Sequence, residues 1–152
     1  IFSAAMLLVE RVNRRTLLVP NIITIPGTAL GLFLSVLTPP GAVSALVGAL
    51  GGGGALFLIA EAYYRSTGRE GLGMGIVKLQ ALVGAFLGWQ LGALTFILGS
   101  MAAAVGSGLL VAVHRKDGRE PSVPFGSYIA LSAMIAATSG HAILNWYLSK
   151  LR

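Results

Sequence analysis

Apolar runs long enough to cross a lipid bilayer follow one another through this chain, separated by short polar or proline-rich breaks. A bilayer core about 30 Å thick needs roughly 20 apolar residues in a helix, so 152 residues can supply several spans. Charged residues make up 11% of the chain, against about 25% in soluble domains, and cannot cover a soluble surface. Within lipid, backbone N–H and C=O groups can all be hydrogen-bonded only in helices or in a closed β-barrel. The expected fold class is all-α, a polytopic membrane helix bundle.

The breaks between the apolar runs predict about six transmembrane helices in a single domain covering residues 1–152. The first helix is partial: residues 1–9 are too short to span alone, and its start is expected to precede residue 1. The proline pair at 39–40 cannot continue a helix, and residues 88–90 are expected to form an interfacial turn. The first helix should end near residue 12, and the others should cover residues 22–37, 42–64, 75–87, 91–113 and 126–148.

The distribution of lysine and arginine predicts the orientation of the bundle. Eight basic residues lie in the connections at residues 10–19, 64–72 and 114–123, whereas the opposite side has only Lys150 and Arg152. Cytoplasmic loops carry the excess of basic residues, so the three basic connections are expected in the cytoplasm. The net charge of +6 is thus explained by topology. The partner surface is a lipid bilayer, and no nucleic acid is expected, because no basic soluble face with interleaved aromatics is present.

The 21 glycines suggest close helix packing. Small residues four apart let helix backbones approach in lipid. The pairs are Gly48 with Gly52, Gly84 with Gly88, Gly88 with Gly92, Ala102 with Gly106, and Ala104 with Gly108. The run at residues 51–54 has two interpretations, a packing surface, which is favoured, or a substrate groove. The chain has no cysteine and its two histidines are isolated, so no metal site and no cofactor are expected.

Two sequence blocks carry a family resemblance. Residues 19–26 read Val-Pro-Asn-Ile-Ile-Thr-Ile-Pro, and residues 70–79 read Glu-Gly-Leu-Gly-Met-Gly-Ile-Val-Lys-Leu. Together they resemble the motifs D-x-x-x-x-x-[LIV]-P-[ND]-x-[LIV]-T-[LIV]-P and E-G-[ML]-G-x-G-D-x-K-L of the prepilin leader peptidases, which are GxGD intramembrane aspartyl peptidases. Residues 84–90 fit the family's continuation, and Val-Pro-Phe-Gly at 123–126 resembles its I-P-F-G-P segment, with Ser127 where proline is common.

The chain departs from these motifs at the two aspartates that the family uses for catalysis. Asn13 stands seven residues before Pro20, and Ile76 follows Gly75 in the GxG block. The resemblance implies that Asn13 and Ile76 occupy the catalytic positions and face one another near the cytoplasmic membrane boundary. It also places Gly73, Gly75, Lys78, Pro20, Asn21 and Glu70 beside the substrate.

An aspartyl mechanism needs two carboxylates, one ionised and one protonated. Asparagine cannot exchange a proton near neutral pH, isoleucine has no polar atom, and the single aspartate, Asp117, lies in a polar loop. The chain is therefore expected to be inactive as it stands. Three explanations remain open: engineered inactivation, a natural pseudo-peptidase, or a misassigned residue at each position. Glu10, Glu61 and Glu70 are the remaining acids near these positions, and interfacial acids beside arginines are the favoured interpretation of all three.

The family resemblance implies an aspartic endopeptidase that cleaves pilin-like precursors at the cytoplasmic face of a bacterial or archaeal cytoplasmic membrane. It also implies that the family's amino-terminal cytosolic domain is absent from this sequence, and a homo-oligomer is possible. Some relatives methylate the new amino terminus, but no methyl-donor motif is identified here. Lys78 has two interpretations, snorkelling to the surface or tuning the site. A small transporter or channel, or a non-catalytic assembly subunit, is the alternative, and the charges crowded at helix ends disfavour transport.

Overall fold

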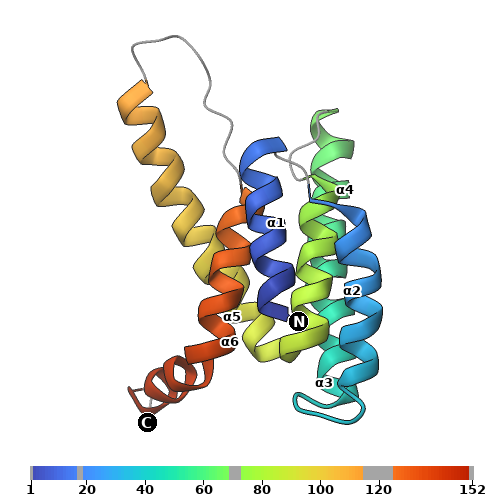
Figure 1. Ribbon diagram of the computed structural model, residues 1–152. Helices are drawn as coiled ribbons and strands as arrows, with labels where there is room; N and C mark the ends of the chain where they lie inside the picture. Colours follow the sequence, from blue (N-terminus) through green and yellow to red (C-terminus); the bar gives the residue numbers. More distant parts are fainter. Residues whose placement is uncertain (1, 17–18, 69–72, 115–124, 151–152) are drawn as a thin grey trace.

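The computed structural model describes residues 2–16, 19–68, 73–114 and 125–150, apart from the side chains of residues 110–114 and Leu148. Every regular element in these ranges is helical, which confirms the all-α prediction (Figure 1). The elements are α1 (Phe2–Thr16), α2 (Asn21–Leu34), α3 (Ala42–Val47), the π-helix η1 (Gly48–Gly52), α4 (Gly53–Thr67), α5 (Met74–His114) and α6 (Phe125–Lys150).

Helix α5 consists of two segments that fold back on one another at Gly88 (Figure 1). Gly88 has φ 76° and ψ 179°, a conformation that glycine adopts without a steric penalty. Gln80, in the first segment, donates a 2.8 Å hydrogen bond through Nε2 to the carbonyl oxygen of Gly92 in the second. The predicted break at residues 88–90 is therefore confirmed, although the two flanking helices count as one element.

Three predicted helix ends are wrong by three or four residues, and one of them is the end of α4, at Thr67 instead of residue 64. Helix α1 continues to Thr16, beyond the expected end near residue 12, and the Thr16 hydroxyl donates to the carbonyl oxygen of Val12. Its last turn carries Arg14 and Arg15, so the change from apolar to polar residues marks the edge of the apolar region and not the end of the helix. Helix α2 ends at Leu34 instead of residue 37, where the Ser35 hydroxyl donates to the Leu32 carbonyl.

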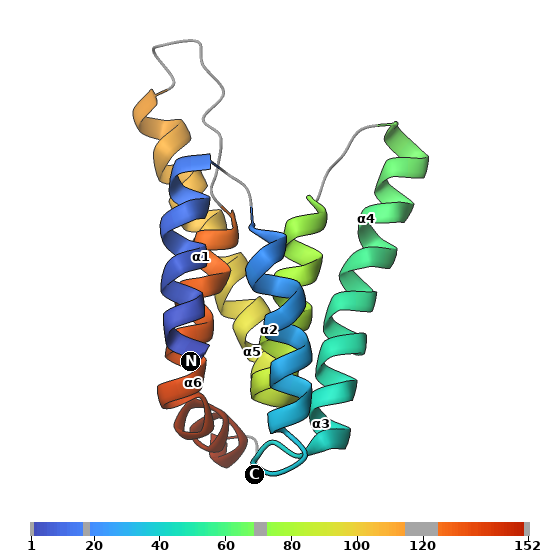
Figure 2. The same cartoon turned by 45° about the vertical axis from the view of Figure 1, so that its right-hand side comes forward.

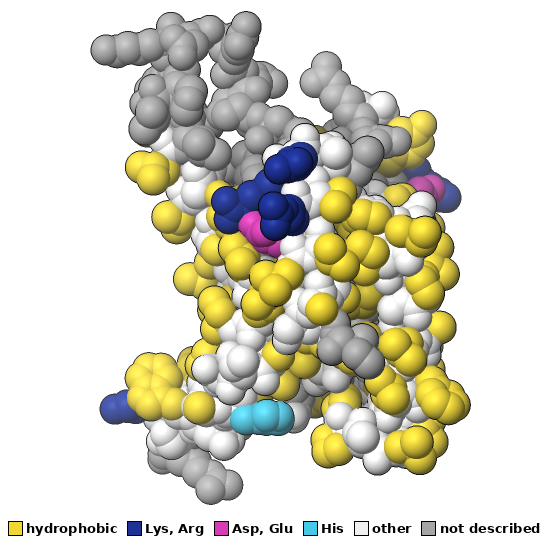
Figure 3. Space-filling model, viewed as in Figure 1, with side chains coloured by type: hydrophobic (Ala, Val, Ile, Leu, Met, Phe, Trp, Pro, Cys, Tyr) yellow, Lys and Arg dark blue, Asp and Glu magenta, His cyan; other side chains and the backbone are white. Residues whose placement is uncertain are grey.

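Among the described residues, three helices are long and apolar enough to cross a membrane: Ala42–Thr67, Met74–Leu109 and Phe125–Tyr147. Helix α2, Asn21–Leu34, is a shorter apolar helix. The stretch Met74–Leu109 includes the bend at Gly88 and so covers two of the predicted spans. Large hydrophobic side chains are exposed on most helices, as a lipid-facing surface requires (Figure 3). These features confirm a membrane helix bundle.

The core lies where α1, the first segment of α5 and α6 meet (Figure 2). It is formed by fully buried apolar side chains that come from all three helices, namely Met6, Val9, Leu79, Leu82, Val83, Ile129, Ala130 and Ala133. We call this set the central cluster. Helices α2 and α4 pack on other sides of α5, with Gly27 against Leu82 and Gly53 against Ala81.

The two ends of the bundle differ in charge. The end of α1, the end of α4 and the start of α5 lie at one end of the bundle (Figure 1). The end of α1 carries Arg11, Arg14 and Arg15, the end of α4 carries Arg65, and basic side chains are visible at this end in Figure 3. The connection between α2 and α3 lies at the opposite end together with the bend of α5, because a Cβ at Gly88 would lie 2.9 Å from Cβ of Pro40. Residues 115–124, the third basic connection, lie outside the described residues.

Cysteine labelling tests this orientation without background, since the chain has no cysteine. We expect Ser66→Cys, at the basic end, to react with an impermeant maleimide only from the cytoplasmic face, and Thr38→Cys only from the opposite face. Both residues are exposed. Labelling of the two cysteines from the same face would contradict the topology. Ser122, also expected at the cytoplasmic face, lies outside the described residues.

Candidate functional site

The two sequence blocks meet in space at the starts of α2 and α5. Lys78 Nζ donates a 3.0 Å hydrogen bond to Asn21 Oδ1, across 57 positions of sequence. A Cβ at Gly75 would lie 2.9 Å from Cβ of Val19, so only glycine permits this approach. Pro20 precedes α2 and its carbonyl oxygen accepts the first backbone hydrogen bonds of that helix. The contact between Lys78 and Asn21 favours the interpretation in which Lys78 belongs to the site.

Asn13 is buried, with 2% of its surface exposed, and it contacts the start of α6. Its Oδ1 accepts hydrogen bonds from the backbone N–H of Ser127 at 2.9 Å and from the Ser127 hydroxyl at 3.2 Å. The first backbone N–H groups of a helix have no partner within the helix. Asn13 therefore caps α6 from a different helix. A Cβ at Gly126 would lie 3.0 Å from Cγ of Asn13, so glycine allows the close approach.

Ser127 is a site residue that the sequence analysis did not select. It stands where proline is common in the resembling family, and proline has no N–H to donate. The 2.9 Å bond to Asn13 therefore depends on the departure at position 127. Two of the chain's departures from the family motifs are in direct contact. The signal that could have identified Ser127 was this second departure, in a segment that otherwise matches.

Ile76 lies in the first turn of α5, where its N–H donates a 3.0 Å hydrogen bond to the carbonyl oxygen of Gly73. Its half-buried side chain packs against the central cluster. Asn13 follows Val9 of that cluster by one helical turn, and Ile76 precedes Leu79 by three residues. Both positions thus lie at the same end of the bundle, at the end of α1 and the start of α5 (Figure 1). That their side chains face one another stays a prediction.

The other acidic residues near the site are ion-paired within their own helices. Glu10 pairs with Arg14, and Glu61 accepts a 2.8 Å hydrogen bond from Nε of Arg65, both four residues apart. Such pairs are typical of interfacial acids, as the sequence analysis favoured. Glu70 lies outside the described residues.

Comparisons with known proteins identify relatives. Residues 1–108 match the model of the type IV leader peptidase family. The chain is similar to proteins named prepilin leader peptidase/N-methyltransferase from two bacteria. It is 36% identical to the one from Aeromonas salmonicida over 139 residues, which are 89% of this chain and 46% of the relative. For Pseudomonas putida the identity is 34% over 144 residues, 91% of this chain and 48% of the relative. The chain thus spans about half the length of these relatives, and no solved structure matches it.

Proposed function

Since the chain belongs to the type IV leader peptidase family, we propose that it has the site of an aspartic endopeptidase acting on pilin-like precursors. The observation that carries the proposal is the contact between the two motif blocks, through Lys78 with Asn21 and Gly75 with Val19. We assign the positions of the family's two aspartates to Asn13, at the end of α1, and Ile76, at the start of α5. Restoring carboxylates at positions 13 and 76 and measuring precursor cleavage tests the proposal.

The surroundings of the two positions would give two carboxylates different protonation states. At position 13 a carboxylate would receive the N–H and hydroxyl hydrogen bonds of Ser127, which favour the ionised form. Hydrogen bonds to a charged group contribute about 1.5–3 kcal/mol each. A carboxylate at position 76 would gain about 0.3–1 kcal/mol from the dipole of α5. The central cluster beside it favours the neutral form. Position 13 would therefore be the ionised member.

The different protonation states would give the carboxylates at positions 13 and 76 different roles. An ionised carboxylate at position 13 would remove a proton from the attacking water while the carboxyl at position 76 donates its proton to the carbonyl oxygen. Position 13 would then pass its proton to the leaving nitrogen as the C–N bond breaks, and position 76 would recover a proton from the gem-diol hydroxyl. In the chain as it stands, Asn13 preserves the hydrogen bond to Ser127 but cannot accept that proton. Ile76 has no proton to donate. The chain would therefore bind a precursor and leave it uncut.

A serine substitution tests the role of position 13. In a chain carrying Asn13→Asp and Ile76→Asp, Ser127→Ala removes the hydroxyl donor and leaves the N–H. The ionised carboxylate is less stabilised, so more of it is protonated at a given pH. We expect the acidic limb of the pH–rate profile for cleavage to move to higher pH. Ser107→Ala, which removes a hydroxyl that donates to the carbonyl oxygen of Ala104 in its own helix, is the matched control. An unshifted acidic limb would contradict the assignment.

The proposed location is the bacterial cytoplasmic membrane, with the chain crossing it several times and the basic end in the cytoplasm. The helices able to span a membrane and the bacterial origin of the relatives support it. A pilin-like precursor whose basic leader lies in the cytoplasm would reach positions 13 and 76 from that side. We also propose the surrounding lipid as a partner and leave a homo-oligomer as a possibility to be measured.

A further inference from the structure

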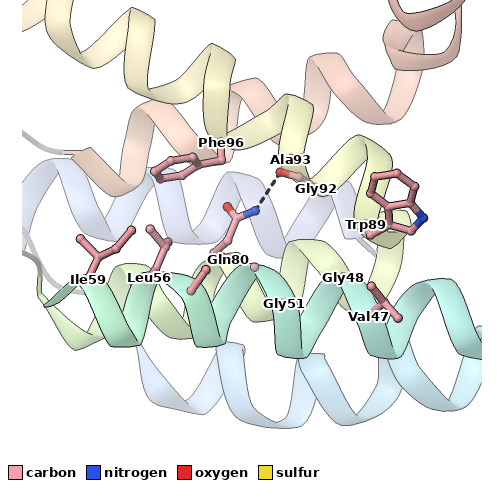
Figure 4. Close-up of a pocket in the computed structure, with 12 residues that line it drawn as sticks. Val47, Gly48, Gly51, Leu56, Ile59, Gln80, Trp89, Gly92, Ala93 and Phe96 are labelled. Atoms are coloured by element: carbon pink, nitrogen blue, oxygen red, sulfur yellow. Dashed lines mark hydrogen bonds between the residues drawn. The ribbon is translucent and has the colours of Figure 1, made fainter. Parts of the chain in front are cut away.

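A partly open cavity of about 340 Å³ lies between α4 and the two segments of α5 (Figure 4). Its volume falls in the range of pockets that hold ligands, about 300–1,000 Å³. Its lining runs from Val47, the last residue of α3, along η1 and α4 to Ile59, and the facing wall comes from Trp89, Gly92 and Phe96. Twelve residues of helix correspond to about 18 Å of length. The cavity is therefore a groove that extends along the bundle axis, and we call it the Gly51 groove.

Gly51 leaves the groove open. A Cβ at Gly48 would lie 2.6 Å from the carbonyl oxygen of Gly84, and one at Gly53 would lie 2.9 Å from Cβ of Ala81, so these glycines serve helix packing. A Cβ at Gly51 would meet no atom within 4 Å. Gly53 packs against α5, as the favoured interpretation of the glycine run predicts, whereas Gly51 borders the groove. The groove also coincides with η1, and π-helical turns occur frequently at functional sites.

Gln80 lines the groove and holds one buried polar atom that has no hydrogen-bond partner among the described residues. The side chain is buried, with 2% of its surface exposed, and its Nε2 donates to the Gly92 carbonyl. Because Gly92 offers an acceptor, the amide must present its nitrogen there and direct Oε1 elsewhere. Oε1 has no hydrogen-bond partner among the described residues. A buried acceptor without a donor is destabilising. An occupant of the groove whose N–H or O–H group reaches Oε1 would therefore be stabilised by a hydrogen bond.

Gln80, which lines the groove, lies one helical turn from position 76, one of the two proposed catalytic positions. Gln80 follows Ile76 by four residues, so the two side chains share a face of α5 and differ by about 6 Å along its axis. An extended peptide advances about 3.3 Å per residue. A peptide whose scissile bond lay at position 76 would therefore bring a backbone N–H about two residues further on to the level of Gln80.

We propose that the Gly51 groove receives the start of the precursor's apolar segment, in extended form, with Gln80 Oε1 accepting a hydrogen bond from its backbone N–H. This inference rests on the proposed function. An acyl chain fits the apolar walls but has no donor. A water molecule fills about 30 Å³ and needs two to four polar partners, whereas the lining side chains other than Gln80 and Trp89 are apolar or glycine. In a helix, the N–H groups beyond the first turn are already hydrogen-bonded within the helix. The middle of a helix from a second copy of the chain therefore has no free N–H for Gln80 Oε1, which disfavours it as the occupant.

Disulfide trapping tests the occupant. The probe is a synthetic precursor peptide with a lysine-rich leader, an apolar segment and a single cysteine placed in turn at each position after the cleavage point. The protein keeps Asn13 and Ile76, because it would then bind the peptide without cutting it. Either Gly51→Cys or Gly108→Cys is introduced, and each variant is mixed with the peptide in membranes. Both glycines have open space around a Cβ, but Gly108 does not line the groove. We expect Gly51→Cys to trap peptides with cysteine in the first few positions, at several times the yield of Gly108→Cys.

The outcomes separate the inference from the function on which it rests. Equal trapping by both variants, with the peptide still retained, overturns the groove and leaves the proposed function intact. Pairing of Gly51→Cys with itself between chains shows that a second copy fills the groove and also overturns the inference. Failure to retain the peptide overturns both.

A kinetic measurement tests Gln80 as a positioning residue. In a chain carrying Asn13→Asp and Ile76→Asp, Gln80→Met removes the acceptor, and we expect KM to rise roughly three- to ten-fold with kcat changed less. Gln80→Glu, protonated when buried, keeps both a donor for Gly92 and an acceptor, and should restore KM. Gln90→Met, at an exposed position, is the matched control. An unchanged KM for Gln80→Met, or an equally raised KM for Gln80→Glu, would overturn this role.

Discussion

Asn13→Asp together with Ile76→Asp is expected to produce cleavage of a precursor that the unmodified chain leaves intact. Each positioned acid or base contributes about 10²–10⁴-fold to a rate, so restoring both should raise cleavage by about 10⁴-fold or more. The carboxylate at position 13 would be held ionised by Ser127, and the one at position 76 would be kept protonated beside the central cluster. A gel shift of the precursor, with the new amino terminus sequenced, measures the result. Cleavage should fall just before the apolar segment.

The single variants are the controls for this prediction. Asn13→Asp or Ile76→Asp alone supplies one carboxylate without the partner that carries the second proton, so each should remain near the level of the unmodified chain. If the unmodified chain cleaves as fast as the double variant, the catalytic positions are wrong. Glu10, Glu61 and Glu70 would then be the acids to test. A double variant that folds and binds the precursor but does not cut it would contradict the proposed function.

Gly84→Ala is expected to destabilise the bundle by about 1–3 kcal/mol. At this point two helix backbones are in contact, because a Cβ at Gly48 would lie 2.6 Å from the Gly84 carbonyl oxygen. A methyl group on Gly84 would in turn overlap the backbone of Gly48. A backbone cannot move aside as a flexible side chain can, so η1 and α5 would have to separate. Denaturant unfolding in detergent, followed by circular dichroism, measures the loss.

Gly108→Ala provides a matched control with an effect of opposite sign. Gly108 is also inside α5, but a Cβ there would meet no atom within 4 Å. Alanine is favoured over glycine in a helix by about 1 kcal/mol, so this variant should be slightly more stable than the unmodified chain. Equal destabilisation by the two variants would show that glycine flexibility, and not the contact with Gly48, explains the result. The open space at Gly108 also shows that the predicted packing of Ala104 and Gly108 does not hold among the described residues.

Helix boundaries could be predicted only approximately from the sequence. The break at Gly88 was predictable, because a polar and aromatic turn interrupts two apolar runs, and Gly88 indeed has positive φ. The end of α1 could not be predicted, because Arg14 and Arg15 are compatible with a helix that continues beyond the apolar region. Apolar runs report where a chain can lie in lipid, and the hydrogen-bonded helix extends past that limit.

The positions of the candidate site stay a prediction from the sequence, and its contacts could not be predicted. Spacing relative to Pro20 and Gly75 selected Asn13 and Ile76, but nothing local indicated that Asn13 would cap α6 through Ser127, 114 positions away. In the sequence, Gln80 is one polar residue within an apolar run. We single it out because Oε1 has no partner among the described residues, and this depends on how α4 and α5 approach each other.

By itself, the sequence determined that this chain is a helical membrane bundle and which of its ends is basic, and it predicts that Asn13 and Ile76 stand at the positions of the family's aspartates. These properties depend on hydropathy, charge and spacing, which are local and additive along the chain. The tertiary structure alone decided that Lys78 contacts Asn21, that Ser127 holds Asn13, and that Gly48 packs while Gly51 borders a groove. Those outcomes depend on the distances between helix axes and on the rotation of each helix, because a shift of about one residue turns a packed face toward lipid.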